Sequence, residues 1–347
     1  MIWSYSYIET VHSKLNEYIL EFFNKIKDDT AGFRDELFNS DFLQIVNRHP
    51  SILKKRLRIV YNYLNTLPAK DRELLCDEIK FANQIEKICQ GEYKPKTFDQ
   101  SVQGIDKIIK DFFLSLYDQV LDGDPFRELN NTNLRAHFNQ FSNANENIIL
   151  CPFCGISFLK KSGDTIRDQY DHYLPKSLYP FSAVNFQNLV LTCRECNSLD
   201  VKANKDILAL SVGKIFFPFD KSHKSIHLQI NVVKDNAKIE LIEWQIIFSS
   251  SDNKKDEIES WKKIYKIEDR YKGHIKSQVK SWYECYFDVI TSSKLEGCSI
   301  EDIKRIYSIT LATKQKQKSD YIQKPVFDAL LADSNIMQAQ IEASKYT

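Results

Sequence analysis

Two pairs of cysteines, each with two residues between its members, constrain the fold of this chain more than any other feature. CPFCG holds Cys151 and Cys154, and LTCRECNS holds Cys193 and Cys196. In a CxxC turn the backbone curls so that both thiolates reach one ion, and two such turns complete a tetrahedral shell of four sulfur ligands. Zinc suits this shell, which leaves no open coordination position. The pairs therefore predict one structural Zn²⁺ ion bound by all four cysteines.

Two other interpretations of the cysteines stay open at this point. The pairs could be unrelated, or one of them could be a redox pair, although a redox CxxC normally stands alone at the start of a helix. The N-terminal residues MIWSYSYIET have no signal-peptide pattern, and no apolar run is long enough to span a membrane. We therefore expect a cytoplasmic protein with no membrane contact, in which cysteines stay reduced and available to metal.

The composition is that of a folded, nearly neutral chain. Hydrophobic residues make up 43% of the 347 residues, charged residues make up 27%, and the formal net charge is +1. This balance excludes a polycationic protein and disorder over the whole chain. Any contact with nucleic acid must come from local basic patches.

Hydrophobic periodicity divides the chain into four segments, and the predicted fold class is α+β, mostly α. Apolar residues recur at three- and four-residue steps through residues 1–125, which predicts a helical N-terminal domain. The Asn-rich residues 126–146 are typical of a linker. Residues 147–210 contain both cysteine pairs and form the predicted core, and residues 211–347 read as a β-hairpin (IHLQINVVK and IELIEWQIIF) followed by helices.

Polar residues with a chemical use lie between and beside the cysteine pairs. Asp171 and His172 occur in YDHYLPKSLYP, Asn188 begins the short apolar run NLVLTC, and Asn197 follows Cys196 directly. The order along the chain is cysteine pair, strand ending in Asp-His, loop, strand, cysteine pair. The residues NSLDVKANK then predict the start of a helix. We therefore expect a β-hairpin packed on a helix, with zinc at its base.

This arrangement resembles the HNH nucleases of the ββα-metal superfamily, in the branch with the signature CxxC…DH…N…CxxCN. The matching part covers residues 147–205. The resemblance implies that His172 is the general base, that Asp171 and Asn197 bind one catalytic Mg²⁺ ion (with Mn²⁺ able to substitute), and that Asn188 braces the loop between the strands.

The chemistry of phosphodiester hydrolysis agrees with the implied roles. The reaction needs a base active near neutral pH, and imidazole has a pKa of about 6.5. It also needs positive charge near the phosphoryl oxygens, which oxygen-bound Mg²⁺ supplies. The chain departs from the family by having Asp200 where a lysine often stands. Basic residues expected to contact phosphates nevertheless lie nearby, namely Lys160, Lys161, Lys176, Arg194, Lys202 and Lys205.

The sequence therefore predicts a metal-dependent endonuclease that cleaves DNA, with RNA left open as a substrate. The layout also looks like that of HNH subunits of Septu-type anti-phage defence systems, which implies an ATPase partner subunit. The alternative is a non-enzymatic zinc module that binds nucleic acid or protein. Such a module would keep the cysteines but would have no use for Asp171, His172 and Asn197.

Overall fold

The structure of the chain is a computed structural model. It describes residues 1–98, 105–161, 163–165, 168–224, 226–236, 238–295, 298–335 and 337. Contacts divide the chain into two compact units, and each is described by itself. The α1–α9 unit comprises Ser4–Glu146 and Lys160–Lys221, and the α10–α13 unit comprises Met1–Trp3, Asn147–Leu159 and Ser222–Thr347.

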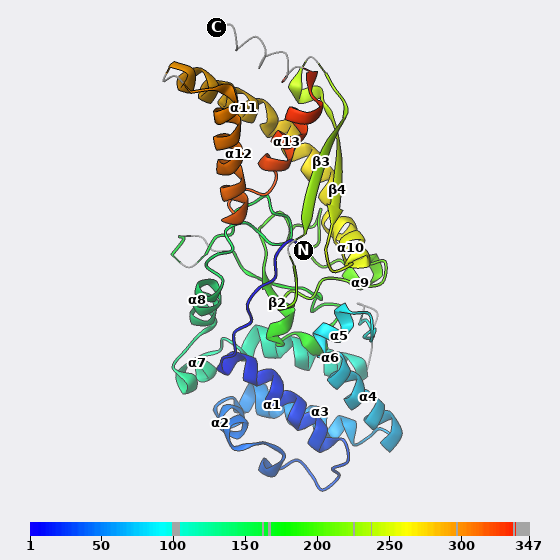
Figure 1. Cartoon of the computed structure of the whole chain (residues 1–347). Helices are drawn as coiled ribbons and strands as arrows, with labels where there is room; N and C mark the ends of the chain where they lie inside the picture. Colours follow the sequence, from blue (N-terminus) through cyan, green and yellow to red (C-terminus); the bar gives the residue numbers. More distant parts are fainter. Residues whose placement is uncertain are drawn as a thin grey trace. The chain divides into compact units, whose positions relative to one another are not determined.

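Helices make up most of the α1–α9 unit (Figure 1). Buried side chains of α1, α3 and α6 share one hydrophobic core, as the apolar periodicity predicts. The first helix begins after Thr10, whose hydroxyl accepts a hydrogen bond from the backbone N–H of His12. The helices are α1 (Val11–Ile26), α2 (Ser40–Arg48), α3 (Lys55–Leu64), α4 (Ala69–Phe81), α5 (Ile85–Cys89), α6 (Ile105–Ser115), α7 (Asp124–Asn130), α8 (Leu134–Ala144) and α9 (Ile207–Leu210).

Residues 126–146 are mostly helical, so the loop conformation that their Asn content suggested is not found. Asn133 caps α8 because its side chain accepts a hydrogen bond from the backbone N–H of Ala136 at 2.8 Å. Asn131 ends α7 with φ of 47°. Asparagine favours turns, but it also favours both ends of helices. Phe138 and Phe141 are buried on α8, which gives this helix an inward face.

The hairpin predicted between the cysteine pairs is present in the α1–α9 unit. Strands β1 (Tyr170–His172) and β2 (Leu189–Leu191) pair antiparallel, with Asp171 opposite Val190. The connection between them contains two short 3₁₀ turns, η4 (Pro180–Ser182) and η5 (Phe186–Asn188). Strand β2 leads directly toward Cys193.

The helix expected to begin after Cys196 does not form. Residues 197–205 make turns, and the next helix is the four-residue α9, which Asp206 caps. Ala203 has φ of 36°, a left-handed conformation that interrupts any regular helix. The ammonium of Lys205 donates to the backbone carbonyls of Asp200 and Val201, which satisfies groups that a helix would have paired. Residues 197–205 therefore form turns in place of the helix that a ββα core would have as its third element.

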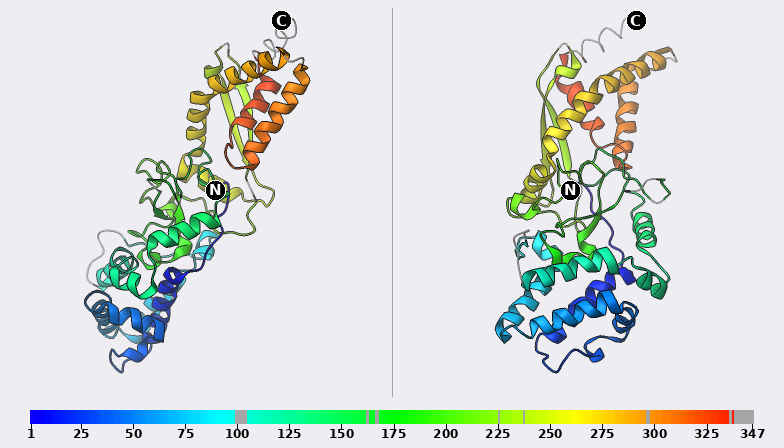
Figure 2. Two further views of the ribbon diagram at one scale, coloured as in Figure 1. Left: turned by 90° about the vertical axis from the view of Figure 1, so that its left-hand side faces the viewer. Right: turned by 180° about the vertical axis from the view of Figure 1, so that it is seen from behind.

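The α10–α13 unit is built on a longer hairpin. Strands β3 (His227–Lys234) and β4 (Glu243–Ser249) pair antiparallel, and α10 (Lys255–Tyr265), α11 (Ile267–Leu295), α12 (Ile300–Lys316) and α13 (Gln323–Asp333) complete the unit (Figure 2). Helix α13 lies against β3, while α10 and α11 lie against β4. This hairpin and the helices after it confirm the sequence-based expectation for the region.

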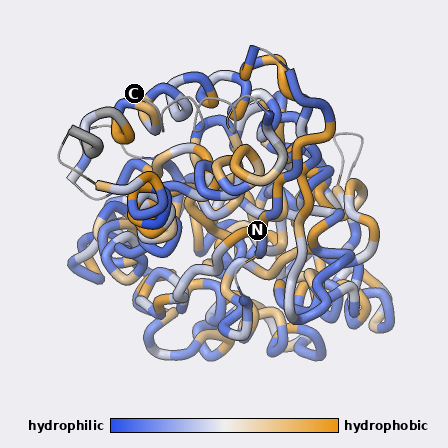
Figure 3. Tube along the Cα trace, turned by 45° about the horizontal axis from the view of Figure 1, so that its top comes forward, coloured by the Kyte–Doolittle hydropathy of each residue, from blue (hydrophilic) through white to orange (hydrophobic). Residues whose placement is uncertain are grey.

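The described residues give an α+β fold that is mostly helical, with two small antiparallel hairpins. Hydrophobic and hydrophilic residues alternate along the trace, as helices with one buried face require (Figure 3). None of the described helices combines the length and apolar character needed to cross a bilayer. Each of the two units combines separate stretches of the chain, so they do not correspond to the four consecutive segments predicted from the sequence. Those segments remain a prediction.

Candidate metal centre and the Asp171–His172 site

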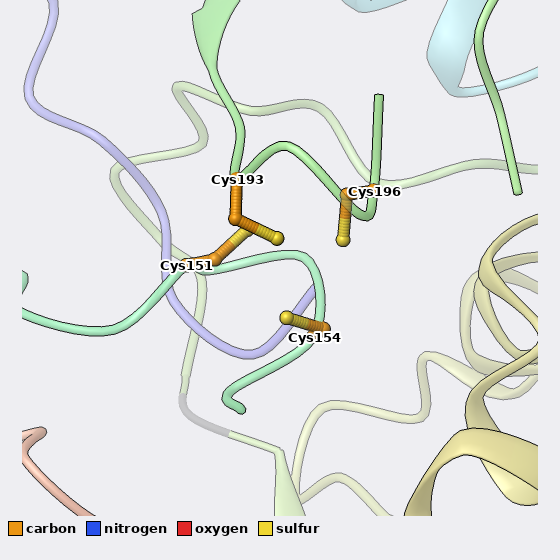
Figure 4. Close-up of side chains that lie close together, drawn as sticks. All are labelled: Cys151, Cys154, Cys193 and Cys196. Atoms are coloured by element: carbon orange, nitrogen blue, oxygen red, sulfur yellow. The ribbon is translucent and has the colours of Figure 1, made fainter. Parts of the chain in front are cut away.

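The four paired cysteines form one buried cluster (Figure 4). Their sulfur atoms all lie within 4.8 Å of one another and point toward a common space. Four converging thiols with no other polar ligand among them suit a thiophilic ion such as Zn²⁺. The predicted cluster of Cys151, Cys154, Cys193 and Cys196 is therefore present and could hold a metal.

Backbone hydrogen bonds curl the chain at each pair. The N–H of Gly155 donates to the carbonyl of Cys151 at 2.7 Å, and the N–H of Asn197 donates to the carbonyl of Cys193 at 3.1 Å. Gly155 has φ of 64°, and a Cβ atom there would lie 2.5 Å from the side chain of Ile2. The first turn therefore requires glycine directly after its second cysteine.

His172, at the end of β1, is held in one orientation. Its Nε2 atom lies 2.9 Å from the backbone carbonyl of Ala183, and the ring of Tyr117 packs edge-on against it at 4.5 Å. A carbonyl can only accept a hydrogen bond, so Nε2 carries the proton. The neutral ring then has its lone pair on Nδ1, which is the atom able to accept a proton.

Asp171 is engaged by the chain's own cation, Lys202. The Lys202 ammonium donates to Asp171 Oδ1 at 2.8 Å, to Asp171 Oδ2 at 2.7 Å and to the carbonyl of His172 at 2.7 Å. The Lys202 side chain is 0% exposed, and that of Asp171 is 7% exposed. All three ammonium protons therefore have an acceptor, and both carboxylate oxygens have a donor.

Burial dominates the protonation behaviour of these groups. It raises the pKa of Asp171 and lowers that of Lys202, and the attraction within the pair opposes both shifts. Burial also lowers the pKa of His172 to about 3, and the positive charges of Lys176 and Lys202 contribute in the same direction. His172 is therefore neutral at pH 7 and is a weaker base than a free imidazole, whose pKa is about 6.5.

Asn188 is completely buried and ties the two ends of the connection between β1 and β2 together. Its Oδ1 accepts from the N–H of Leu174 at 2.7 Å, and its Nδ2 donates to the carbonyl of Leu174 at 3.0 Å. Nδ2 also lies 3.2 Å from the hydroxyl of Ser182. These contacts hold the loop that carries Ala183, and so they hold the acceptor of His172.

The predicted magnesium ligands do not fit a magnesium ion as they are arranged. Mg²⁺ binds oxygen at about 2.0–2.1 Å, and the Lys202 ammonium already contacts both oxygens of Asp171. Asn197 is exposed beside Cys196, and within the described part of the chain no hydrogen bond joins its side chain to Asp171. We therefore derive no step of a reaction through magnesium at these residues.

Most of the lysines expected to contact phosphates have partners within the chain. Lys176 pairs with Asp118, while the ammonium of Lys161 donates to the carbonyls of Asn145 and Glu146. Lys160 and Arg194 are exposed. The sequence placed Lys202 among the basic residues expected to contact phosphates and did not indicate its pairing with Asp171, and it indicated no role for Tyr117 or Ala183. No local spacing indicates these contacts, because each joins residues from distant segments.

No protein-family model, curated protein or solved structure matches this chain. These comparisons therefore assign the chain to no family, and the HNH resemblance rests on the residues of the CxxC…DH…N…CxxCN signature. What the fold establishes is a buried four-cysteine cluster beside a hairpin that carries Asp171 and His172.

Proposed function

We propose that the chain is an HNH-type endonuclease that hydrolyses phosphodiester bonds of DNA, with His172 as the general base and one structural zinc ion at the four cysteines. The observation that carries this proposal is the hydrogen bond from His172 Nε2 to the carbonyl of Ala183. It leaves Nδ1 unprotonated on a hairpin that continues directly into Cys193.

In this reaction Nδ1 of His172 takes a proton from a water molecule whose oxygen attacks the phosphorus. The bond between phosphorus and the 3′ oxygen breaks, and that oxygen takes a proton from solvent, which gives 5′-phosphate and 3′-hydroxyl ends. A role in anti-phage defence with an ATPase partner rests on the resemblance alone.

Nicking of supercoiled plasmid by zinc-loaded protein tests this function. We expect His172→Ala to lower the rate by at least about 10²-fold, the usual contribution of a general base. His227→Ala is the matched control, because His227 is exposed on β3 of the other hairpin. Equal rates for wild type and His172→Ala would show that the assignment of the base is wrong.

One observation favours a second function, a zinc module that binds nucleic acid or protein without cleaving it. His172 is only 9% exposed, and Asp171 is neutralised within the fold. A binding module has no need of an accessible base. It would show binding of labelled DNA in a gel shift that His172→Ala leaves unchanged, with no nicking by any variant.

A further inference from the structure

The position of Lys202 determines which cation can lie beside Asp171 and His172. An ammonium at 2.7 and 2.8 Å from the two oxygens of Asp171 occupies the space on that carboxylate that a metal ion would need. Both side chains are buried, so the charges are poorly screened by water. A divalent ion bound to the same carboxylate would lie within a few ångströms of the ammonium and would be repelled by it.

The backbone fixes Lys202 at this place. Its N–H donates to the carbonyl of Cys196 at 3.3 Å, and the left-handed conformation of Ala203 turns the chain directly after it. The ammonium reaches past Asp171 to the carbonyl of His172 at 2.7 Å, which links it to both residues of the Asp-His pair. The cation is thus built into the segment that follows the second cysteine pair.

We propose that Lys202 is the resident cation of the Asp171–His172 site and takes the place that the HNH resemblance assigns to magnesium. A divalent ion then binds at Asp171 only where the Lys202 ammonium has been removed. The inference deepens the proposed nuclease function and rests on it for its catalytic meaning.

Binding of Mn²⁺ to the full chain, purified with zinc and followed by electron paramagnetic resonance, tests the proposal without nucleic acid. We expect wild type and Asp171→Asn to bind Mn²⁺ equally weakly. We expect Lys202→Met, which keeps the unbranched chain as far as the ε carbon and removes the ammonium, to bind at least about tenfold more tightly, since tenfold corresponds to about 1.4 kcal/mol. The double variant Lys202→Met/Asp171→Asn should lose this gain.

Two outcomes of the titration would overturn the proposal. The first is Mn²⁺ binding by wild type that Asp171→Asn weakens tenfold or more. The second is a folded Lys202→Met variant, with normal zinc content, that binds Mn²⁺ no better than wild type. Neither outcome depends on cleavage, so a failure here is distinct from a failure of the proposed nuclease function.

A measurement on wild type alone covers the case in which Lys202→Met does not fold. Acetylation of lysines by an amine-reactive reagent, followed by mass spectrometry, reports whether the ammonium of Lys202 is accessible. We expect slow labelling of Lys202 that Mn²⁺ does not change, with Lys234, whose side chain is 72% exposed, as the fast internal control. If Mn²⁺ accelerates labelling at Lys202 and not at Lys234, the divalent ion displaces the ammonium and the proposal is wrong.

Discussion

The two hairpins of this chain bury their side chains in different ways. The β3–β4 hairpin alternates exposed and buried residues through the first four residues of each strand, with apolar residues inward, as in an ordinary half-buried sheet. The β1–β2 hairpin has only three residues in each strand, and it buries the polar residues Asp171 and His172. Buried polar groups destabilise a fold unless they are paired.

The two hairpins are therefore stabilised by different kinds of contact. A two-stranded hairpin as short as β1–β2 has too little apolar area of its own to be stable. Its order must come from contacts beyond the strands, namely Lys202 on Asp171, Asn188 on the loop, and the cysteine pair that follows β2. The β3–β4 hairpin instead depends on apolar packing against α10, α11 and α13. Matched substitutions in the two hairpins test this division.

Loss of the metal centre should have the largest effect. Binding of structural zinc contributes roughly 10–16 kcal/mol of apparent free energy to the folding of small zinc-binding domains. We expect Cys193→Ser to lose the metal and to abolish hydrogen-exchange protection in β1–β2 while β3–β4 keeps its protection. Cys76→Ser is the control, because Cys76 is buried on α4 outside the cluster. Normal zinc content in Cys193→Ser would contradict the assignment of the cluster.

Removal of the buried cation should have the next largest effect. Lys202→Met leaves the Asp171 carboxylate buried without a partner, and we expect a loss of about 3–5 kcal/mol of unfolding free energy. Lys234→Met is the counterpart in the other hairpin, where the ammonium lies 3.8 Å from exposed Glu243. That pair should contribute less than about 1 kcal/mol. If Lys202→Met and Lys234→Met lose equal amounts of unfolding free energy in denaturant titrations, the two hairpins do not differ in their dependence on an ion pair.

The sequence predicts the local features of both hairpins but not the contacts that hold β1–β2. Cysteine spacing predicts the cluster because each pair forms within one turn, and alternation predicts β3–β4 because polar and apolar residues alternate from His227 to Val232 in β3. The pairing of Lys202 with Asp171 depends on how residues 197–205 turn, and the left-handed Ala203 has no sequence signal. The helix wrongly predicted there follows from the same local ambiguity.

Loss of the loop brace should have a smaller effect. Asn188→Ala leaves the N–H and carbonyl of Leu174 without their partner, and we expect a loss of about 2–4 kcal/mol because both are buried. Asn231→Ala removes an exposed contact to Gln245 across β3–β4 and should cost less than about 0.5 kcal/mol. Similar stabilities of the two variants in denaturant titrations would argue against a bracing role for Asn188.

Acid should act on the surroundings of β1 gradually, over more than two pH units. Burial lowers the pKa of His12 to about 4 and that of His137 to about 3, and His137 Nδ1 lies 2.7 Å from the hydroxyl of Tyr170 in β1. The unfolded chain binds more protons than the folded chain between the unfolded pKa of about 6.5 and these lowered values. Stability is therefore complete above pH 6.5 and falls toward pH 4, by up to about 1.4 kcal/mol per pH unit for each histidine.

A single variant separates the contribution of His12 to the loss of stability in acid from the contribution of the carboxylates. His12 Nε2 makes no hydrogen bond within the described chain, so His12→Leu removes its titration without breaking a polar contact. The unfolding free energy of the variant should fall less steeply between pH 6.5 and 4, by up to about 1.4 kcal/mol per pH unit. If His12→Leu runs parallel to wild type, then His12 is not held neutral by burial, and the acid sensitivity of the β1 surroundings must come from His137 or from the carboxylates.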